Sequence, residues 1–424
     1  MSHPTVYRLS NQVQHYDWGS HTDIGGLLGT PDSGRPEAEL WLGAHNSAPS
    51  MAQPWHDAAA TPIPLNQLIQ QYPVETLGNR VLDEFGPRLP YLLKVLAADR
   101  ALSLQVHPAS HLARAGFNRE NREKIPIDAP YRNFKDENHK PEMVVAVTEF
   151  HALAGLRAPR VILRMLDGLT GPLFDLVRNA ITAQPNPNGI RAAMTALLAQ
   201  REATSLVSEL AEAVASIKER ILTGSQYEVA DQTAIDLAEQ YPGDVGALSS
   251  YLLNRVTLLP GEALYLGDGE VHAYLKGLGV EIMANSDNVL RAGLTTKHVD
   301  VPALLECMSF SPKMPFRPEP FELGESSRSF SYRPPSPEFA LTMIDLHGEP
   351  LPVHASGPRI LLVMDGDIVL TYGGAIGLDP EIPKITGFPL TALQLKRGDS
   401  IFIPDAIGAI QVAGAGQVAC GWVP

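Results

Sequence analysis

Proline and glycine divide most of this sequence into short pieces. The chain of 424 residues contains 36 prolines and 35 glycines. Proline removes a backbone hydrogen-bond donor and glycine favours turns, so this spacing predicts short β-strands joined by turns. One region, about residues 160–251, is different because its apolar residues recur three or four positions apart, which predicts helices. We therefore expect a mainly β protein that is interrupted by a helical block.

The helical block shows its periodicity most clearly in the stretch 189–222. Its apolar stripe consists of Leu206, Leu210, Val214, Ile217 and Ile221. Such a stripe usually packs against other helices. We therefore expect a packing or lid module that contributes no chemistry of its own.

Composition and charge narrow the class of protein. No apolar run approaches the roughly 20 residues that cross a bilayer, and the N-terminus lacks the pattern of a secretion signal, so we expect a cytoplasmic protein with no membrane partner. A net charge of -14 opposes the phosphate backbone, which argues against a nucleic-acid partner. Only Cys307 and Cys420 are present, so a bound metal would need nitrogen and oxygen ligands.

Two segments of the β-rich part share one scheme. Residues 258–274 and 395–412 both contain a glycine–acid turn, a small residue, bulky strand residues and a second turn. When the two turns are aligned, His272 falls opposite Ala409. The sequence therefore predicts two copies of one β unit, with a polar ligand present only in the first.

The stretch "ALSLQVHP", residues 101–108, places polar residues within an apolar run. In an extended strand Ser103, Gln105 and His107 share one face, opposite the leucine and valine side chains. That face either carries a function or is simply exposed to water.

Two other polar residues lie at expected strand ends. Pro141 excludes a central strand position, so Glu142 opens a strand. His272 follows a Gly–Asp–Gly turn at the edge of an apolar strand. Two histidines, a carboxylate and an amide oxygen suit a borderline divalent ion such as zinc. Spacing alone also fits hydrogen-bonded or exposed imidazoles.

Long motifs around these residues closely resemble the type I mannose-6-phosphate isomerases, also called phosphomannose isomerases. The motifs are "YDWGS", "RPEAELWLGAHNSAPS", "LPYLLKVLAADRALSLQVHP", "GFNRENREKIPIDAPYRNFKDENHKPEM" and "GEVHAYLKGLGVEIMANSDNVLRAGLTTKHVDV". The resemblance covers residues 7–157 and 255–305. The helical block and the C-terminal third match only in kind and position.

The resemblance implies a fold of two cupin-type (jelly-roll) β-barrel domains with an inserted α-helical domain. We expect a catalytic cupin domain in 1–157 and 255–320, the helical domain in 158–254, and a cupin-like domain without metal ligands in 321–424. It further implies zinc-dependent interconversion of D-mannose 6-phosphate and D-fructose 6-phosphate, with one zinc ion per chain. We expect a monomer whose partner is a small sugar phosphate.

The resemblance also implies roles for individual residues. The zinc ligands are Gln105, His107, Glu142 and His272. The catalytic residues are Arg291, Lys94 and Lys140. The substrate-binding residues are Trp18, Ser103, His139, Glu281, Asp287 and Lys297. Ser110 stands where the family commonly has lysine, which puts phosphate contacts near it in doubt.

The chemistry leaves several roles open. Transfer of a proton from C2 to C1 through an enediol needs a fixed positive charge, which zinc or Arg291 can supply, and a base. A lysine whose pKa is lowered in the pocket can serve as base, or Lys94 and Lys140 can instead pair with the phosphate or with an acid. Lys297 and His298 either neutralise phosphate or cap a helix that begins near residue 302.

Two other functions fit the same scaffold. The first is a non-catalytic, metal-stabilised sugar-phosphate sensor, and the second is an iron-dependent cupin oxygenase with a two-histidine, one-carboxylate site. The lysines and the arginine argue for handling of a sugar phosphate over oxygen chemistry.

Overall fold

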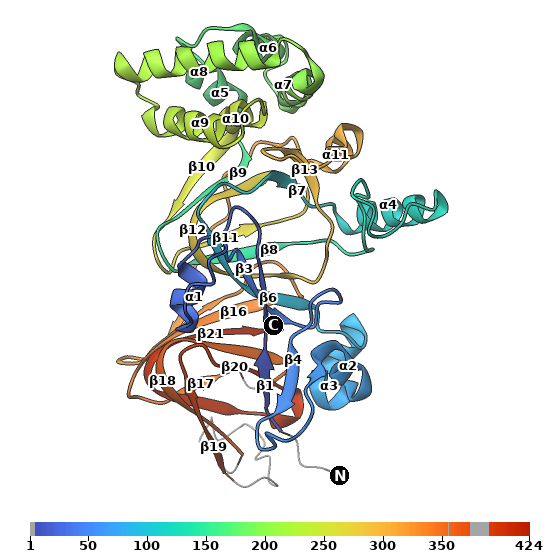
Figure 1. The fold of residues 1–424 in the computed structure, drawn as a ribbon, viewed down its shortest axis with the longest axis vertical. Helices are drawn as coiled ribbons and strands as arrows, with labels where there is room; N and C mark the ends of the chain where they lie inside the picture. Colours follow the sequence, from blue (N-terminus) through green and yellow to red (C-terminus); the bar gives the residue numbers. More distant parts are fainter. Residues whose placement is uncertain (1–4, 355, 374–389) are drawn as a thin grey trace.

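The chain folds into three tiers, which are stacked along the long axis in Figure 1. This computed structural model describes residues 5–354, 356–373 and 390–424. The helical block lies at the top, one antiparallel sheet lies in the middle and a second antiparallel sheet lies at the bottom. The expected mainly β class with a helical insertion is therefore confirmed.

The middle sheet carries most of the predicted site residues. Its longest strand, β12, pairs with four neighbouring strands, β6, β7, β8 and β9. Its strands are β2 (Gln12–Gln14), β3 (Glu39–Gly43), β6 (Tyr91–Ala98), β7 (Leu104–Val106), β8 (Glu142–Ala146), β9 (Phe150–Leu156), β10 (Leu253–Leu258), β11 (Ala263–Leu266), β12 (His272–Ala284) and β13 (Leu290–Gly293). The predicted strand starts at Glu142 and His272 are confirmed.

The lower sheet combines strands from both ends of the chain. Its strands are β1 (Tyr7–Ser10), β4 (Met51–Pro54), β5 (Ile63–Pro64), β14 (Phe321–Leu323), β15 (Arg328–Tyr332), β16 (Ala340–His347), β17 (Leu351–Val353), β18 (Arg359–Tyr372), β19 (Thr391–Lys396), β20 (Ser400–Ile403) and β21 (Ile410–Trp422). β1 pairs with β20, so three strands of the predicted 1–157 domain lie in the sheet of the predicted C-terminal domain. The four domain ranges themselves stay a prediction.

The predicted repeat has a structural counterpart in the two sheets. Gly261 and Gly398 both adopt φ 86°, which favours glycine because a Cβ is strained there. Each glycine is followed by a four-residue strand, β11 or β20, and then by a thirteen-residue strand, β12 or β21. His272 opens β12, whereas Ala409 directly precedes β21, so the histidine is present only in the first copy.

Two apolar layers hold the tiers together. One core cluster lies between the two sheets and includes Leu93 and Ile282 of the middle sheet and Phe402 of the lower sheet. A second cluster joins the helical block to the apolar faces of β7 and β13, including Val106 and Ala292. The helical block and these two strands therefore share one core.

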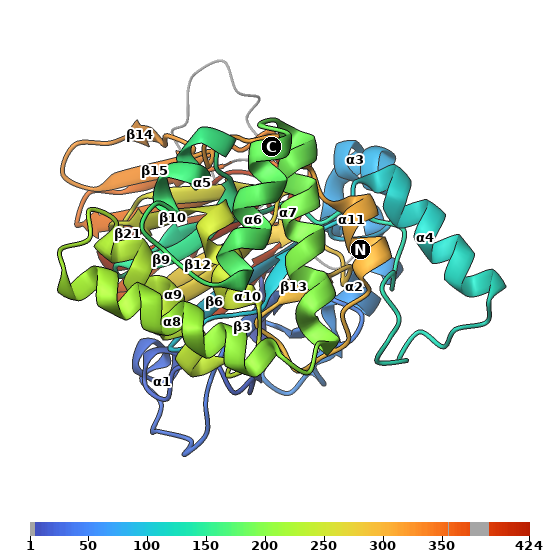
Figure 2. The ribbon, with the colours of Figure 1, turned by 90° about the horizontal axis from the view of Figure 1, so that it is seen from above.

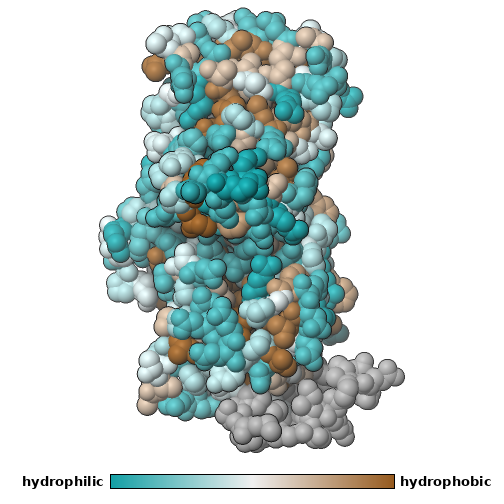
Figure 3. All heavy atoms as spheres, turned by 90° about the vertical axis from the view of Figure 1, so that its right-hand side faces the viewer, coloured by the Kyte–Doolittle hydropathy of each residue, from teal (hydrophilic) through white to brown (hydrophobic). Residues whose placement is uncertain are grey.

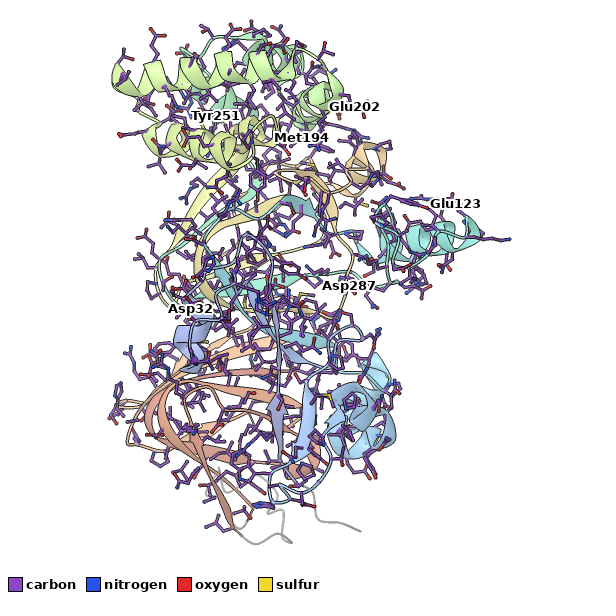
Figure 4. The ribbon with its side chains drawn as sticks, in the orientation of Figure 1. Asp32, Glu123, Met194, Glu202, Tyr251 and Asp287 are labelled. Carbon is purple, nitrogen blue, oxygen red and sulfur yellow. The ribbon has the colours of Figure 1, made fainter. Side chains whose placement is uncertain are left out.

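The helical block agrees with the predicted region. It consists of α5 (Pro159–Met165), α6 (Pro172–Ala183), α7 (Pro187–Ala199), α8 (Leu206–Leu222), α9 (Glu228–Gln240) and α10 (Gly246–Ser249). The apolar stripe of α8 packs inward, with Leu206, Leu210 and Ile217 buried. Seen from above in Figure 2, these helices cover the middle sheet. Tyr251, which is labelled in Figure 4, lies in the shared core at the end of the block.

Five other α-helices lie outside this block among the described residues. They are α1 (Asp23–Leu28), α2 (Leu65–Gln71), α3 (Pro73–Phe85), α4 (Ser110–Arg122) and α11 (Val301–Cys307). Asp300 caps α11 by accepting a hydrogen bond from the Ala303 amide, so the interpretation of Lys297 and His298 as helix caps was wrong. Among the described residues, none of the helices has the length and apolarity to span a membrane. Hydrophilic side chains predominate on the face in Figure 3.

Candidate metal centre and active site

A cavity of about 610 Å³ lies where the middle sheet meets the helical block. Strand alternation creates its polar wall, because the apolar side chains of β3, β6 and β12 pack toward the lower sheet. Ten of the predicted site residues line it: Trp18, Lys94, Ser103, Gln105, Lys140, Glu142, Glu281, Asp287, Arg291 and Lys297. The helical block contributes Arg201 and residues 240–244 to the same cavity.

Three buried side chains form a cluster at the edge of this cavity. Glu142 lies between two histidines, with its Oε1 2.9 Å from His272 Nε2 and its Oε2 3.3 Å from His107 Nε2. Each of the three side chains is 1% exposed. Gln105, two residues before His107, pairs with His272 at the start of β12. Glu142 pairs with Met283 near the other end of β12, so residues far apart in the sequence meet across the middle sheet.

The imidazoles are oriented as metal ligands usually are. His107 Nδ1 donates to the Asn288 carbonyl at 2.7 Å, and His272 Nδ1 donates to the Glu270 carbonyl at 2.8 Å. With Nδ1 donating to a carbonyl, each ring directs its Nε2 toward Glu142. Burial, together with nearby Lys140, lowers the pKa of His107 to about 4, which favours the neutral form.

The cluster fits a divalent ion. Among the described residues, His272 Nε2 is a buried atom without a hydrogen-bond partner, although it lies close to a carboxylate oxygen. Two electron-rich atoms 2.9 Å apart repel unless a proton or a cation lies between them. The three ligand atoms all lie within 4.8 Å of one another, and two imidazoles with one carboxylate are a donor set that zinc accepts.

Gln105 and Lys140 lie next to this cluster. Gln105 is the partner of His272 in the β7/β12 pairing and of Arg291 in the β7/β13 pairing. Lys140 Nζ donates to Glu142 Oε2 at 3.0 Å and to His107 Nε2 at 3.3 Å. The Lys140 amine therefore borders the position that an ion between the three ligands would take, and the backbone of Gln105 lies beside that of His272.

Lys94 is held in a buried ion-pair network on the face of the middle sheet that lines the cavity. Its Nζ lies 3.1 Å from Glu281 Oε2 and 3.3 Å from Glu39 Oε1, and Trp41 Nε1 donates to Glu39 Oε2 at 2.8 Å. Burial lowers the pKa of Lys94, but the two carboxylates outweigh burial and leave this pKa above its usual value. Of the two roles that the sequence left open for Lys94, the structure therefore favours pairing with acids over a lysine of lowered pKa.

A cationic group lies at the side of the cavity toward the helical block. Arg291 is partly buried and Lys297 is exposed, and partial desolvation lowers the pKa of both. Repulsion from Arg291 and Lys135 lowers the pKa of Lys297 further. Lys297 Nζ also lies 5.7 Å from the centroid of the Tyr16 ring. Like charges that repel one another in a cavity favour the binding of an anion.

Asp287, labelled in Figure 4, lies in the loop between β12 and β13. Its Oδ1 lies 3.3 Å from His45 Nε2. Burial raises the pKa of Asp287, but the hydrogen bond and charge of His45 outweigh burial and lower it overall. Trp18 and Ser103 line the same cavity, in agreement with Trp18 as a pocket wall.

Two residues that were singled out from the sequence, His139 and Ser110, do not line the cavity. Both ring nitrogens of His139 face carboxylates, with Nε2 2.6 Å from Glu338 Oε1 and Nδ1 3.2 Å from Asp268 Oδ1. His139 is not among the cavity-lining residues, so the structure gives no support to its predicted substrate contact. Ser110 is exposed at the start of α4 and is likewise not part of the lining.

Sequence reasoning missed several lining residues. Glu39 and His45 were not recognised, although both flank Trp41 in a quoted motif. The alternation of polar and apolar residues in β3 was the signal that places Glu39 and Trp41 on the cavity face. For Arg201 and Asp244 of the helical block, no local pattern distinguishes a cavity residue from an ordinary surface residue.

The fold and the site together define a mainly β protein with a buried two-histidine, one-carboxylate centre that fits a divalent metal ion. The family model for the phosphomannose isomerase type I catalytic domain matches residues 6–159. The mannose-6-phosphate isomerase of Escherichia coli (strain K12) is 36% identical over 98% of both chains. The human mannose-6-phosphate isomerase is 32% identical, over 95% of this chain and 94% of its own length.

Solved structures agree with these relatives. A variant of phosphomannose isomerase from Salmonella typhimurium superimposes with a TM-score of 0.84 at 33% identity, over 99% of both chains. A mannose 6-phosphate isomerase structure bound with zinc and yttrium gives a TM-score of 0.83 at 33% identity, again over 99% of both chains. The chain belongs to the type I phosphomannose isomerase family.

Proposed function

We propose that this chain is a zinc-dependent isomerase that interconverts D-mannose 6-phosphate and D-fructose 6-phosphate. The observation that carries the proposal is the buried His107–Glu142–His272 cluster, which borders a cavity that also contains a cationic group. A sugar phosphate has hydroxyl and carbonyl oxygens at one end and a dianion at the other. The two features of the cavity match these two ends.

The zinc ligands would be His107, Glu142 and His272, with Gln105 as the fourth. This set carries one negative charge against two positive charges, so the centre keeps a net positive charge. When bound, zinc would polarise a carbonyl or hydroxyl oxygen of the sugar. The hydrogen bonds from each histidine Nδ1 to a backbone carbonyl fix the rings for one ion per chain.

The phosphate would bind at the cationic group of Arg291, Lys297 and Lys135. The mutual repulsion that lowers the pKa of Lys297 is relieved when a dianion binds between these side chains. Arg291 also lies beside Gln105 through the β7/β13 pairing, so it reaches toward the reacting end of the sugar as well. A fixed cation there stabilises the negative charge that develops on the enediol oxygen.

Proton transfer between C2 and C1 requires a group that can lose and regain a proton. Lys94, whose pKa lies above its usual value, remains an ammonium ion near neutral pH. It therefore serves as a positive hydrogen-bond donor, and Glu281 and Glu39 hold it in place. Of the two predicted lysines, Lys140 is the better candidate for the proton carrier because its amine borders the metal cluster.

The remaining substrate contacts are Trp18, Ser103, Glu281 and Asp287. Trp18 would form a wall against the sugar ring, and Ser103 shares the cavity face of Gln105. Asp287 would accept a hydrogen bond from a sugar hydroxyl while His45 keeps it ionised. We also propose that the protein works as a monomer in the cytoplasm. Gel filtration at micromolar concentration would check the monomeric state.

A coupled assay tests the function. Metal-replete protein should convert mannose 6-phosphate to fructose 6-phosphate, and a chelator should abolish turnover until zinc is restored. Arg291→Ala should lose rate while its circular dichroism stays unchanged. Binding without turnover would instead support a sugar-phosphate sensor. Bound iron with oxygen consumption would support an oxygenase.

A further inference from the structure

We infer that Asp244 of the helical block is a positioning residue for Arg291. This inference rests on the proposed function, because it assigns the helical block a part in that reaction. Arg291 lies on β13, and the apolar residues on either side of it, Leu290 and Ala292, belong to the core shared with the helices. The strand that carries the arginine is therefore packed directly against the helical block.

The backbone at the end of β13 combines a register shift with a residue of positive φ. The pairing of β7 with β13 shifts register between Arg291 and Gly293, which is a β-bulge. Leu294 follows with φ 54° although it is not a glycine, and it is 1% exposed. Bulges and left-handed residues persist where the surrounding structure enforces them, and bulges re-aim nearby side chains. A contact that holds this turn therefore sets the direction of Arg291.

The carboxylate of Asp244 makes that contact. Its Oδ2 accepts a hydrogen bond from the Thr295 amide at 3.1 Å, and its Oδ1 accepts one from the Gly246 amide at 2.8 Å. Arg201 Nη1 lies 3.5 Å from both oxygens. One side chain thus joins the backbone of the helical block to the backbone that follows β13. The Asp244 side chain is 10% exposed, so water competes little for these bonds.

The backbone at Gly246 and the backbone at 293–294 approach so closely that neither can shift relative to the other without a steric clash. A Cβ placed on Gly246 would lie 2.9 Å from the Leu294 amide nitrogen and 3.1 Å from the Gly293 Cα. A Cβ on Gly293 would lie 2.9 Å from the Gly246 Cα and 3.0 Å from Asp244 Oδ1. Asp244, Arg201, Thr295 and Arg291 all line the cavity. The contact is therefore part of the cavity wall.

A second contact of the helical block holds the segment that leads into β7. Ala101 N donates to Gln240 Oε1 at 2.9 Å, and Arg100 Nη2 donates to the Gln240 carbonyl at 2.9 Å. This segment leads into β7, which carries Gln105 and pairs with β13. The helical block therefore fixes both strands of the pair, at 100–101 and at 295, and Asp244 fixes the strand that carries the arginine.

The first experiment needs no turnover. Asp244→Asn keeps the side-chain shape but has only one oxygen that can accept, and Asp244→Ala loses both bonds. Hydrogen–deuterium exchange should become at least 10-fold faster in the segment 290–296 of both variants, with the other β strands unchanged. The matched control is Glu239→Gln, which breaks the exposed pair between Lys218 and Glu239 in the same block. Unchanged exchange in 290–296 would overturn the inference.

The second experiment separates positioning from a general loss of structure. Asp244→Asn should lower kcat and kcat/KM together by about 10- to 100-fold, as expected for a misplaced transition-state contact. In an Arg291→Lys background the same change should lower kcat by less than about 3-fold, because the geometry of the guanidinium has already been lost. Equal losses in both backgrounds, or faster exchange with unchanged kcat, would refute the assignment.

These two arms also separate this inference from the proposed function. If the wild-type protein shows no isomerase turnover, the proposed function fails. The exchange experiment still decides whether Asp244 holds the turn after β13. If turnover is present and Asp244→Asn behaves like Glu239→Gln in both arms, only the positioning role fails.

Discussion

Replacing Lys94 with methionine tests how much the Lys94 ammonium stabilises the buried carboxylates of Glu39 and Glu281. Lys94 is 7% exposed at its side chain and lies between Glu39 and Glu281, which are 9% and 3% exposed. Without the ammonium group, two buried carboxylates lie close together with no cation between them. Breaking a buried ion pair on one side costs about 3–5 kcal/mol. At about 2–4 °C per kcal/mol for a domain of 150–250 residues, the melting temperature should fall by roughly 6–20 °C near neutral pH.

The matched control is Glu281→Gln. This change leaves Lys94 paired with Glu39, so the remaining pair is neutral, and the loss of stability should be less than half of that in Lys94→Met. The two variants differ in which charge is removed, not in the strand or the depth of burial. A comparison of their melting curves therefore isolates the charge term from the packing term.

The loss should also depend on pH. Burial raises the pKa of Glu281 even beside Lys94, and removal of Lys94 raises it further. A carboxyl group with a raised folded-state pKa stabilises the fold below its unfolded pKa, and this stabilisation is lost as the pH rises through the folded pKa. The deficit of Lys94→Met should therefore grow between about pH 5 and about pH 7.5 in scanning calorimetry. An equal deficit at both values, or a deficit no larger than that of Glu281→Gln, would refute the reasoning.

Three further changes test the metal, the phosphate and the helical block. His272→Ala should lower the zinc content of the purified protein from one ion per chain toward zero, measured by plasma mass spectrometry; full zinc occupancy would contradict the ligand assignment. Lys297→Met should raise the KM for the sugar phosphate by about 10-fold with a smaller change in kcat, and an unchanged KM would exclude a phosphate contact. Asp231→Ala leaves Arg220 and the hydroxyl of Tyr251 without their buried carboxylate and should destabilise the block by about 3–5 kcal/mol, measured as faster proteolysis of the block.

Local signals predicted where the residues of the metal cluster lie in their strands, whereas their role as ligands came from the family resemblance. Pro141 marks a strand start, so Glu142 falls at the mouth of β8, and a tight turn does the same for His272. The polar face of the strand with Gln105 follows from alternation alone. The distance between these three strands in space does not follow from any local signal. It came from the family resemblance and is confirmed by the distances between the His107, Glu142 and His272 side chains.

The features that could not be predicted from the sequence depend on contacts between distant segments. β1 pairs with β20 across almost the whole chain, and no pattern in either strand specifies its partner. The raised pKa of Lys94 has the same origin, because its carboxylates lie on β3 and β12. The family resemblance, through the motif that contains His139 and Lys140, placed His139 in the pocket. Its partners Asp268 and Glu338 come from two other parts of the chain and hold it outside the cavity.

The helical block illustrates how a packing module can also set the geometry of a site. Its two ends leave the middle sheet on adjacent antiparallel strands, where Leu253 pairs with Leu156 and Arg157 N donates to the Leu252 carbonyl at 2.8 Å. A hydrogen-bonded stem of this kind fixes the direction in which the block projects. Because the block also shares a core with β7 and β13, the stem and the core hold it at two separate places. Contacts at both places therefore hold the cavity wall formed by residues 240–244 against the middle sheet, as preorganised catalysis requires.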